Sequence, residues 1–327
     1  PIAGLVHPPM SGTAGFSSLP DARSITRLGD GSFLISTGFA GRLVQLKTSS
    51  PVTTSIVGGY SEVFASAAPA NPLDLATLYI AEASGTAADE AGNLYFSDAT
   101  RGLVYKVSGV TTGEPGSWDL APLDTQSEEP AGLLAVSDRE LWIADRARHC
   151  IVAYDVLTSQ HSVIAGICGI RGHQDGPANQ VLFNGPTHLY RDERGTLYIA
   201  DSLNRRVRAL HNGQVHTILG NGQPAMLQTN QAAVSTAIGK PGALAVDRFG
   251  NLFVAAEEVV WEVANANSDF TLTGMEPAFP IFDATSLPST ESPLKCLEAM
   301  HLLADRESLL VVDGCTGKGF ELHGVQR

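Results

Sequence analysis

Residues 185–210 read GPTHLYRDERGTLYIADSLNRRVRAL, and this stretch decides the fold. It divides into a short apolar strand, a turn of the form Asp-x-x-Gly, a buried strand ending in Asp201, a polar turn and a third strand. Residues 215–220 continue the pattern as a fourth strand. A unit of four successive strands is typical of one blade of a β-propeller.

The second strand of this unit recurs along the chain, and six copies align on its last residue. These last residues are Thr37, Asp98, Asp145, Asp201, Ala256 and Asp313. Their positions differ by 61, 47, 56, 55 and 57 residues in turn. One such sheet cannot bury both of its faces alone, so the copies must stack. We therefore predict an all-β fold, a six-bladed β-propeller with four antiparallel strands per blade, formed by residues 1–327 as a single domain.

The sixth copy has no fourth strand of its own. Its strands are expected near residues 300–303, 309–313 and 319–325. The first seven residues read PIAGLVH and resemble the fourth-strand end SVIAGIC at 162–168. We predict that residues 1–6 complete blade six, because this pairing closes the ring and protects sheet edges that would otherwise invite aggregation.

Composition limits the classes of partner. The formal net charge of −13 disfavours nucleic acid, because a phosphate-binding protein is expected to carry a basic face. No run of 18 apolar residues occurs, so no membrane span is predicted. The sequence does not indicate the oligomeric state.

The four cysteines allow three pairings. Pairing within blades, Cys150–Cys168 and Cys296–Cys315, closes the shortest loops and joins strands that are already neighbours. The alternative is four buried free thiols, as in many cytosolic cores. We predict the two disulfides, which indicate an oxidising compartment and a secreted or lumenal protein.

Three motifs carry a resemblance to a known repeat. The Asp-x-x-Gly turn stands at 89–92, 192–195 and 247–250, residues 200–207 read ADSLNRRV, and the connector 172–178 reads GHQDGPA. The chain resembles the NHL repeat over nearly its whole length, although Thr37 and Ala256 replace the usual aspartate. The resemblance implies a six-bladed propeller. The family includes protein-binding modules, RNA-binding modules and a few enzymes, so the fold does not decide the function.

Two histidines are candidates for ligand or metal contact. His188 stands two residues after the expected blade start, where the other blades have Ser24, Gly85, Gly132, Ala243 and Met300. First strands line the axis of a propeller, so His188 is expected to face the channel. His301 stands near the matching place in blade six. A pair of histidines without a third ligand is weak support for zinc, so no cofactor is expected, and a divalent Ca or Zn ion in the axial channel is left open.

The repeated second-strand aspartates have two interpretations. They could form a ring of carboxylates for calcium, or each could accept backbone N–H bonds in the turn that follows. Repetition in blade after blade favours the second interpretation, because a true site breaks the symmetry of the repeat.

One group of NHL-like enzymes provides a comparison. Peptide-amidating lyases resemble NHL propellers and hold zinc with histidines from the starts of several first strands. The expected positions here are Arg23, Ser84, Ala131, Thr187, Gly242 and Ala299. None is histidine, so this chemistry is not expected.

Arginines and long connectors are the remaining candidates for contact with a partner. Arg101, Arg146, Arg148 and Arg205 follow second strands, so they should gather on one face and could recognise an acidic partner. The connector 269–293 contains apolar residues among several prolines. These apolar residues could form a patch that docks a partner, or they could cap the bottom of the barrel. We expect a non-catalytic protein-interaction or scaffold module with contacts from rim loops. The alternative is a metal-dependent lyase or hydrolase with an axial site near His188.

Overall fold

A computed structural model gives the arrangement of the chain. It describes residues 21–38, 41–46, 53–57, 78, 80–109, 118–226, 231–265, 272–283, 296–303, 308–313, 315 and 319–323. All regular elements in these ranges are strands, apart from two short 3-10 helices, η1 (Ser202–Asn204) and η2 (Ala233–Ser235). The described part of the chain holds no helix long and apolar enough to cross a membrane.

The strands form six antiparallel sheets, numbered here in chain order. Sheet one contains β1 (Ala22–Arg27), β2 (Phe33–Thr37), β3 (Arg42–Leu46) and β4 (Thr53–Val57). Sheet two contains β5 (Ala83–Ala88), β6 (Leu94–Asp98), β7 (Leu103–Ser108) and β8 (Asp119–Leu123). Sheet three contains β9 (Pro130–Ala135), β10 (Glu140–Asp145), β11 (Cys150–Asp155) and β12 (His161–Ala165).

The last three sheets differ in the number of strands. Sheet four contains β14 (Pro186–Arg191), β15 (Leu197–Asp201), β16 (Arg206–His211) and β17 (Gln214–Leu219), with β13 (Gly176–Pro177) added outside. Sheet five contains β19 (Pro241–Val246), β20 (Leu252–Ala256), β21 (Val259–Val263) and β22 (Pro277–Asp283), with β18 (Gln231–Ala232) added outside. Sheet six contains β23 (Leu297–Leu302), β24 (Ser308–Asp313) and β25 (Gly319–His323).

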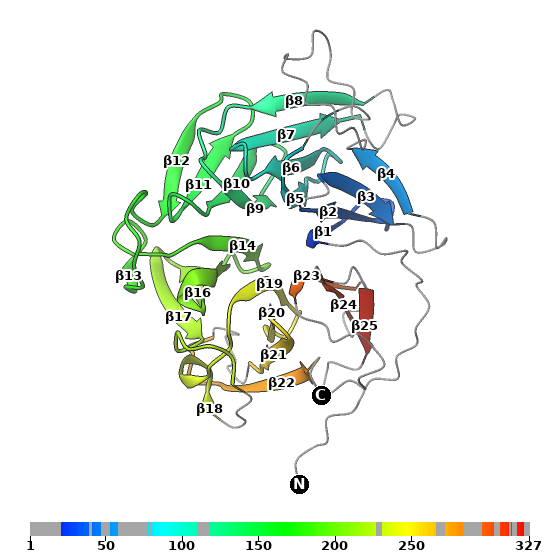
Figure 1. Cartoon of the computed structure of the whole chain (residues 1–327). Coiled ribbons are helices and arrows are strands. Elements are labelled where there is room, and N and C mark those ends of the chain that lie inside the picture. Colours follow the sequence, from blue (N-terminus) through cyan, green and yellow to red (C-terminus); the bar gives the residue numbers. More distant parts are fainter. Residues whose placement is uncertain are drawn as a thin grey trace.

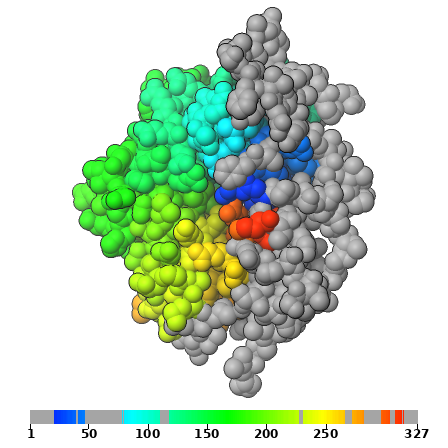
Figure 2. Space-filling view, viewed as in Figure 1, coloured from blue at the N-terminus to red at the C-terminus, as the bar shows by residue number. Residues whose placement is uncertain are grey.

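The sheets stand around a common axis, with the first strand of each nearest the centre (Figure 1). Each inner strand contacts the next in the order β1, β5, β9, β14, β19 and β23, and β23 contacts β1. In Figure 2 the blue and red parts of the chain lie side by side near the middle of the visible face. The described inner strands therefore form a closed ring.

The all-β propeller predicted from the sequence is confirmed, and the predicted set of six four-stranded blades needs correction. The described residues form five complete blades, two of which have a fifth strand, and a sixth sheet of three strands. The extra strands arise because the connectors into sheets four and five pair with β17 and β22. Residues 1–6, predicted to complete blade six, lie outside the described residues.

The Asp-x-x-Gly motif makes the hairpin between the first and second strands. The Asp192 carboxylate accepts hydrogen bonds from the backbone N–H groups of Arg194 and Thr196, at 3.0 and 2.8 Å. Gly195 has φ +89°, a conformation that glycine adopts without steric cost. The motif therefore fixes the tight turn that returns the chain to the sheet.

Apolar faces between neighbouring sheets form the core. Sheets four and five enclose Trp261, which is fully buried, together with Tyr198, Val207, Leu244 and other residues. Similar clusters fill the spaces between the other sheets. Packing between sheets rather than a single central core thus holds the ring, as expected for a repeat fold.

Gly132 sets the spacing between two inner strands, and its replacement by alanine is expected to destabilise the fold by about 1–3 kcal/mol. A Cβ there would lie 2.5 Å from the Thr187 carbonyl oxygen and 3.0 Å from the His188 Cα. Both atoms are backbone, so β9 and β14 must move apart. Urea denaturation measures the loss, and Gly29→Ala is the control because a Cβ at Gly29 meets nothing within 4 Å. Equal midpoints for the two variants would contradict the expectation.

Candidate functional site

Two cavities lie on the axis, one at each end of the inner strands. The start-side cavity, of about 410 Å³, is lined by residues at the starts of these strands. The end-side cavity, of about 470 Å³, is lined by residues at their ends and by the hairpin turns that follow. Ser24, Leu133 and His188 line both cavities. These three residues therefore stand at the junction between them.

A β-bulge decides which side chains line the start-side cavity. Every inner strand has an irregularity in its register directly after its first residue. The residue at this position lines the start-side cavity in all six strands. Bulges re-aim side chains in this way near the ends of strands. The resulting bulge ring consists of Arg23, Ser84, Ala131, Thr187, Gly242 and Glu298.

Charges in the start-side cavity are largely paired. Within the bulge ring, Arg23 Nη1 lies 2.9 Å from Glu298 Oε2; outside the ring, Arg23 Nη2 lies 2.8 Å from Asp21 Oδ1. Burial raises the pKa of Glu298, and the nearby Arg23 opposes this shift. Arg146 forms ion pairs with Glu129 and with Glu82. Arg23, Arg146 and Glu298 therefore already have partners within the protein.

The remaining side chains of the start-side cavity include a cation, the carboxylate of Glu257, an apolar group and hydroxyls. Lys240 lines the cavity and is exposed, and Leu203 is 50% exposed beside it. Thr187 and Ser202 share a hydrogen bond between their hydroxyl groups. The Lys240 ammonium, the hydroxyls and the accessible leucine together suit a ligand that has both acidic and apolar groups.

His188 lies where the sequence placed it, on the axis, and its ring is partly buried. Its Nδ1 has no hydrogen-bond partner among the described residues. Burial lowers the pKa of His188 to about 4, so the ring is neutral at neutral pH. A neutral imidazole can accept a hydrogen bond or coordinate a metal.

His301 does not stand at the position that matches His188. His188 pairs with Ala200 and Ala299 pairs with Val312, each one residue before the end of the second strand. His301 therefore corresponds to Tyr190, and the equivalent of His188 is Ala299 rather than Met300. The register prediction was wrong because β23 begins at Leu297, earlier than the sequence indicated. For the same reason, the blade-six position to compare with the lyase zinc ligands is Glu298, rather than the Ala299 expected from the sequence.

The titration of His188 leads to a prediction about stability. The ordinary histidine pKa of about 6.5 applies to the unfolded chain, so the unfolded state takes up a proton first as the pH falls. Stability contributed by neutral His188 is complete above pH 6.5 and is lost between pH 6.5 and about 4. When the pH falls from 8 to 5, the free energy of unfolding of His188→Gln should therefore rise on the order of 1–2 kcal/mol relative to that of wild type. Calorimetric Tm values at both pH values measure this gain, and identical pH profiles would contradict it.

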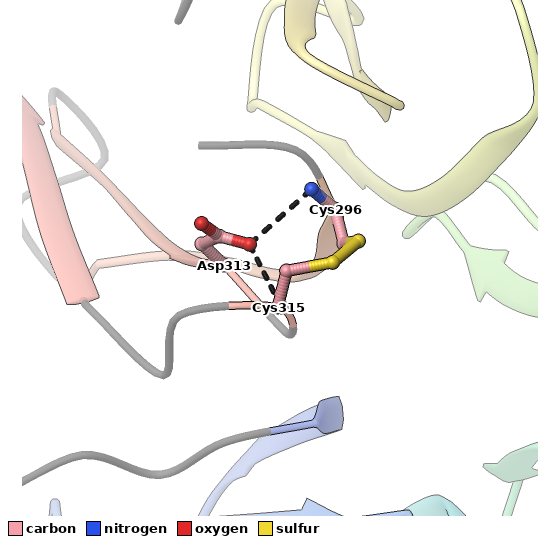
Figure 3. Close-up of side chains that lie close together, drawn as sticks. All are labelled: Cys296, Asp313 and Cys315. Atoms are coloured by element: carbon pink, nitrogen blue, oxygen red, sulfur yellow. Dashed lines mark hydrogen bonds between the residues drawn. A yellow bond between two sulfur atoms is a disulfide. The ribbon is translucent and has the colours of Figure 1, made fainter. Parts of the chain in front are cut away.

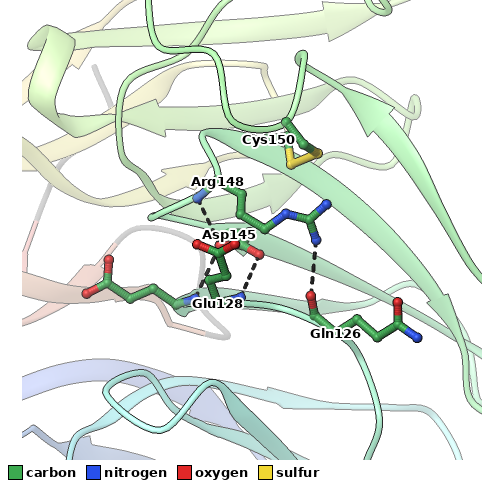
Figure 4. The surroundings of a disulfide bond; sticks show 7 residues. Gln126, Glu128, Asp145, Arg148 and Cys150 are labelled. Carbon is green, nitrogen blue, oxygen red and sulfur yellow. Dashed lines mark hydrogen bonds between the residues drawn. A yellow bond between two sulfur atoms is a disulfide. The ribbon is translucent and has the colours of Figure 1, made fainter.

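The four arginines predicted to meet a partner follow second strands as expected, but their surroundings differ. Arg101 is exposed and lies 3.9 Å from Asp98, whereas Arg146 lines the start-side cavity. Arg148 donates from Nη1 to the Gln126 carbonyl at 3.0 Å (Figure 4). Arg205 ends η1 at φ +51°. Of the four, only Arg146 lines the start-side cavity.

The second-strand aspartates accept backbone N–H bonds, so the structural interpretation of them is confirmed. Asp98 accepts from Ala81, Glu82 and Arg101, and Asp145 accepts from Glu128, Glu129 and Arg148. Each carboxylate thus ties the connector before an inner strand to the turn after the second strand. Figure 4 shows this arrangement at Asp145.

Both predicted disulfides, Cys150–Cys168 and Cys296–Cys315, are present. Cys296, Asp313 and Cys315 are the one group of potential metal ligands in the described residues (Figure 3). Both sulfur atoms are bonded to each other, and Asp313 accepts N–H bonds from Cys296 and Cys315 at 3.2 and 2.9 Å. A disulfide offers no thiolate, so these residues do not fit a metal ion while oxidised.

The propeller is similar to several solved structures. A protein of unknown function from Bacteroides thetaiotaomicron has a TM-score of 0.61 at 12% identity, with 93% of this chain and 69% of that chain covered. A gluconolactonase from Xanthomonas campestris has a TM-score of 0.58 at 14% identity, with 94% and 88% covered. A streptogramin B lyase has a TM-score of 0.55 at 11% identity, with 92% and 78% covered. Identities this low show the fold alone.

No protein-family profile and no curated protein sequence matches the chain. The comparisons therefore establish an all-β propeller, a fold found in proteins described as enzymes and in proteins described as binding proteins. The NHL resemblance stays a prediction from the sequence.

Proposed function

We propose that this chain is a non-catalytic binding propeller that contacts a protein partner on its start-side face. The bulge ring is the observation that carries the proposal. Its one carboxylate, Glu298, is paired with Arg23, and the ring contains no histidine or cysteine among the described residues. A ring of this composition lacks the matched acid, base and nucleophile that catalysis needs.

The partner we propose is a protein segment with acidic side chains and an apolar anchor. Arg101, Arg148 and Lys240 supply positive charge on the start-side face, and arginine recognises carboxylates through paired hydrogen bonds. Leu203, half exposed beside the cavity, offers apolar contact area. The rigid ring would hold these groups in place before binding, which lowers the entropic cost of association.

Two disulfides support an oxidising compartment for this interaction. We propose that the protein is secreted or lumenal, as the cysteine pattern predicted. An interaction on the outside of a cell or in a lumen would require a stable scaffold, which the disulfides help to provide.

Charge reversal on the start-side face tests the proposal. Wild type, Arg148→Glu/Lys240→Glu and the control Arg139→Glu/Arg191→Glu would be used as bait in native extract, with cross-linking and mass spectrometry to map contacts. The control makes the same charge change at the opposite end of the strands. We expect one specific protein to be captured by wild type and by the control and to be lost with the start-side variant. Capture of no specific protein at several salt concentrations, or undiminished capture by the start-side variant, would refute the proposal.

A second candidate function is a metal-dependent lyase or hydrolase with its site near His188. The observation that favours it is a neutral imidazole on the axis whose Nδ1 has no hydrogen-bond partner among the residues that the structure describes. Propellers described as a lyase and as a gluconolactonase share the fold, although the identities are too low to carry a mechanism. Metal analysis of protein purified without chelator or affinity tag separates the two functions. Stoichiometric zinc or calcium that disappears in His188→Ala would favour the enzyme. Protein purified without metal would favour the binding propeller.

A further inference from the structure

The end-side cavity has a charge pattern of its own. Arg27 at the end of β1, Arg194 in the turn after β14 and Arg248 in the turn after β19 all line it. All three side chains are exposed at its mouth. Asp192, Glu193 and Asp247 line the same cavity, so the three arginines bring the formal charge of its lining to zero in a chain whose formal charge is −13.

Two of the acidic residues that line this cavity are committed to their own turns. The Asp192 carboxylate accepts from the N–H groups of Arg194 and Thr196. The Asp247 carboxylate accepts from the N–H of Phe249 and from the backbone and side chain of Asn251. Glu193 is the other acidic residue that lines the cavity. Of the exposed charged side chains that line the cavity, three are therefore arginines and one is a carboxylate.

The floor of the cavity offers polar groups. His188 lines the floor, and its Nδ1 has no partner in the described part of the chain. The Thr26 and Thr86 hydroxyls lie 2.8 Å apart along one wall. Such groups can bind the oxygens of a small ligand below the arginines.

The three arginines come from opposite sides of the ring. Arg27 belongs to sheet one, whereas Arg194 and Arg248 belong to sheets four and five. Sheet four is three places from sheet one in the ring of inner strands, so cations stand on both sides of the mouth. A ligand that meets both sides needs an anionic group at each end.

We propose that the end-side cavity binds a small organic dianion with a carboxylate or phosphate group at each end. Arg27 would hold one end, and Arg194 and Arg248 would hold the other, since the guanidinium fork matches both anions. The site is separate from the start-side face proposed for a protein partner. The proposal for the end-side cavity and the proposal for the start-side face can therefore fail independently.

His301 supplies an independent readout. It lines the same cavity, and burial together with the nearby charge of Arg27 lowers its pKa to about 4. A bound anion would offset the charge of Arg27. The pKa of His301 should therefore rise when the site is filled.

Calorimetric titration with glutarate and with pyrophosphate tests the site, and acetate is the monoanionic comparison. Arg27→Gln and Arg248→Gln should each weaken binding of the dianions by about 10-fold or more, from the loss of charge-assisted hydrogen bonds. Arg191→Gln removes the same charge from the end of β14 without lining the cavity, so it should bind as wild type does. Lys240→Gln, on the start-side cavity, should also leave binding unchanged. Glutarate binding alone would identify a dicarboxylate site, and pyrophosphate binding alone a phosphate site.

NMR titration of the histidine rings completes the test. The site is supported if a saturating dianion raises the pKa of His301 in wild type and not in Arg27→Gln. It is refuted if neither dianion binds, if acetate binds as well as the dianions, or if Arg191→Gln weakens binding as much as Arg27→Gln does.

Discussion

Replacing Arg208 by methionine is expected to destabilise the folded protein by about 3–5 kcal/mol, because it leaves a buried carboxylate without its counter-ion. Arg208 is 0% exposed, and its Nη1 donates to Asp201 at 2.9 Å. Its Nε donates to Asp175 at 3.0 Å, and its Nη2 donates to the Gln174 carbonyl at 2.9 Å. The guanidinium thus joins β15 and β16 to the connector before sheet four.

Urea denaturation at pH 8 measures this loss, with Arg139→Met as the control. Arg139 pairs with Asp155 at the surface, where its side chain is 57% exposed, so the control should lose less than about 1 kcal/mol. Burial raises the pKa of Asp201 and Arg208 opposes the shift, so without Arg208 the carboxyl takes up a proton more readily. The deficit of Arg208→Met should therefore shrink as the pH falls from 8 to 5. A deficit no larger than that of the control would show that the buried pair is not needed for stability.

The sequence predicted the fold wherever one residue type performs one local task in each copy. Asp192 and Gly195 make a tight turn that only their side-chain chemistry and backbone freedom explain. Asp98 and Asp145 end second strands because their carboxylates bind N–H groups of the preceding connectors. Such interactions span few residues, so they leave a readable pattern. The disulfides were predictable for a related reason, since the two cysteines of each pair are only 18 or 19 residues apart within one repeat.

The candidate site was less predictable because bulges decide it. A bulge moves one residue toward the axis without any marked change in composition; the comparison with the lyases named Arg23 at this register, but it named Ala299 in place of Glu298. His188 stood out by its chemistry alone, and the sequence placed it correctly on the axis. Lys240, before sheet five, and Leu203, in η1 of sheet four, line the start-side cavity together only after both sheets fold. Contacts of this kind have no local sequence signal.

Strand β22 shows how proline can hide a strand. Pro277 and Pro280 made the connector 269–293 look like a docking patch or a cap on the barrel. The structure instead places 277–283 as the outer strand of sheet five, paired with β21 on one side and with β18 over a short stretch on the other. Proline is tolerated on outer strands, where fewer ladder hydrogen bonds are required.

Removal of the Cys150–Cys168 disulfide is expected to cost about 3 kcal/mol, because the pair closes a loop of 18 residues in the unfolded chain. Cys150 is buried at the start of β11, and Cys168 lies in the connector that leads to sheet four. Urea denaturation of Cys150→Ala/Cys168→Ala, compared with wild type, measures the loss; the Cys296–Cys315 disulfide is intact in both proteins. In wild-type protein that is denatured without a reducing agent, we expect a count of free thiols near zero. Four free thiols would contradict both pairs.

The disulfide and Arg208 hold the same connector, so their contributions should not add. Cys168 fixes the start of the connector, and Asp175 with Gln174 binds Arg208 further along it. Once either attachment is lost, the connector is less ordered and the other attachment stabilises the fold less. The triple variant should therefore lose less than the sum of the separate losses, by about 0.5–3 kcal/mol. Strict additivity in this double-mutant cycle would show that the two attachments act independently.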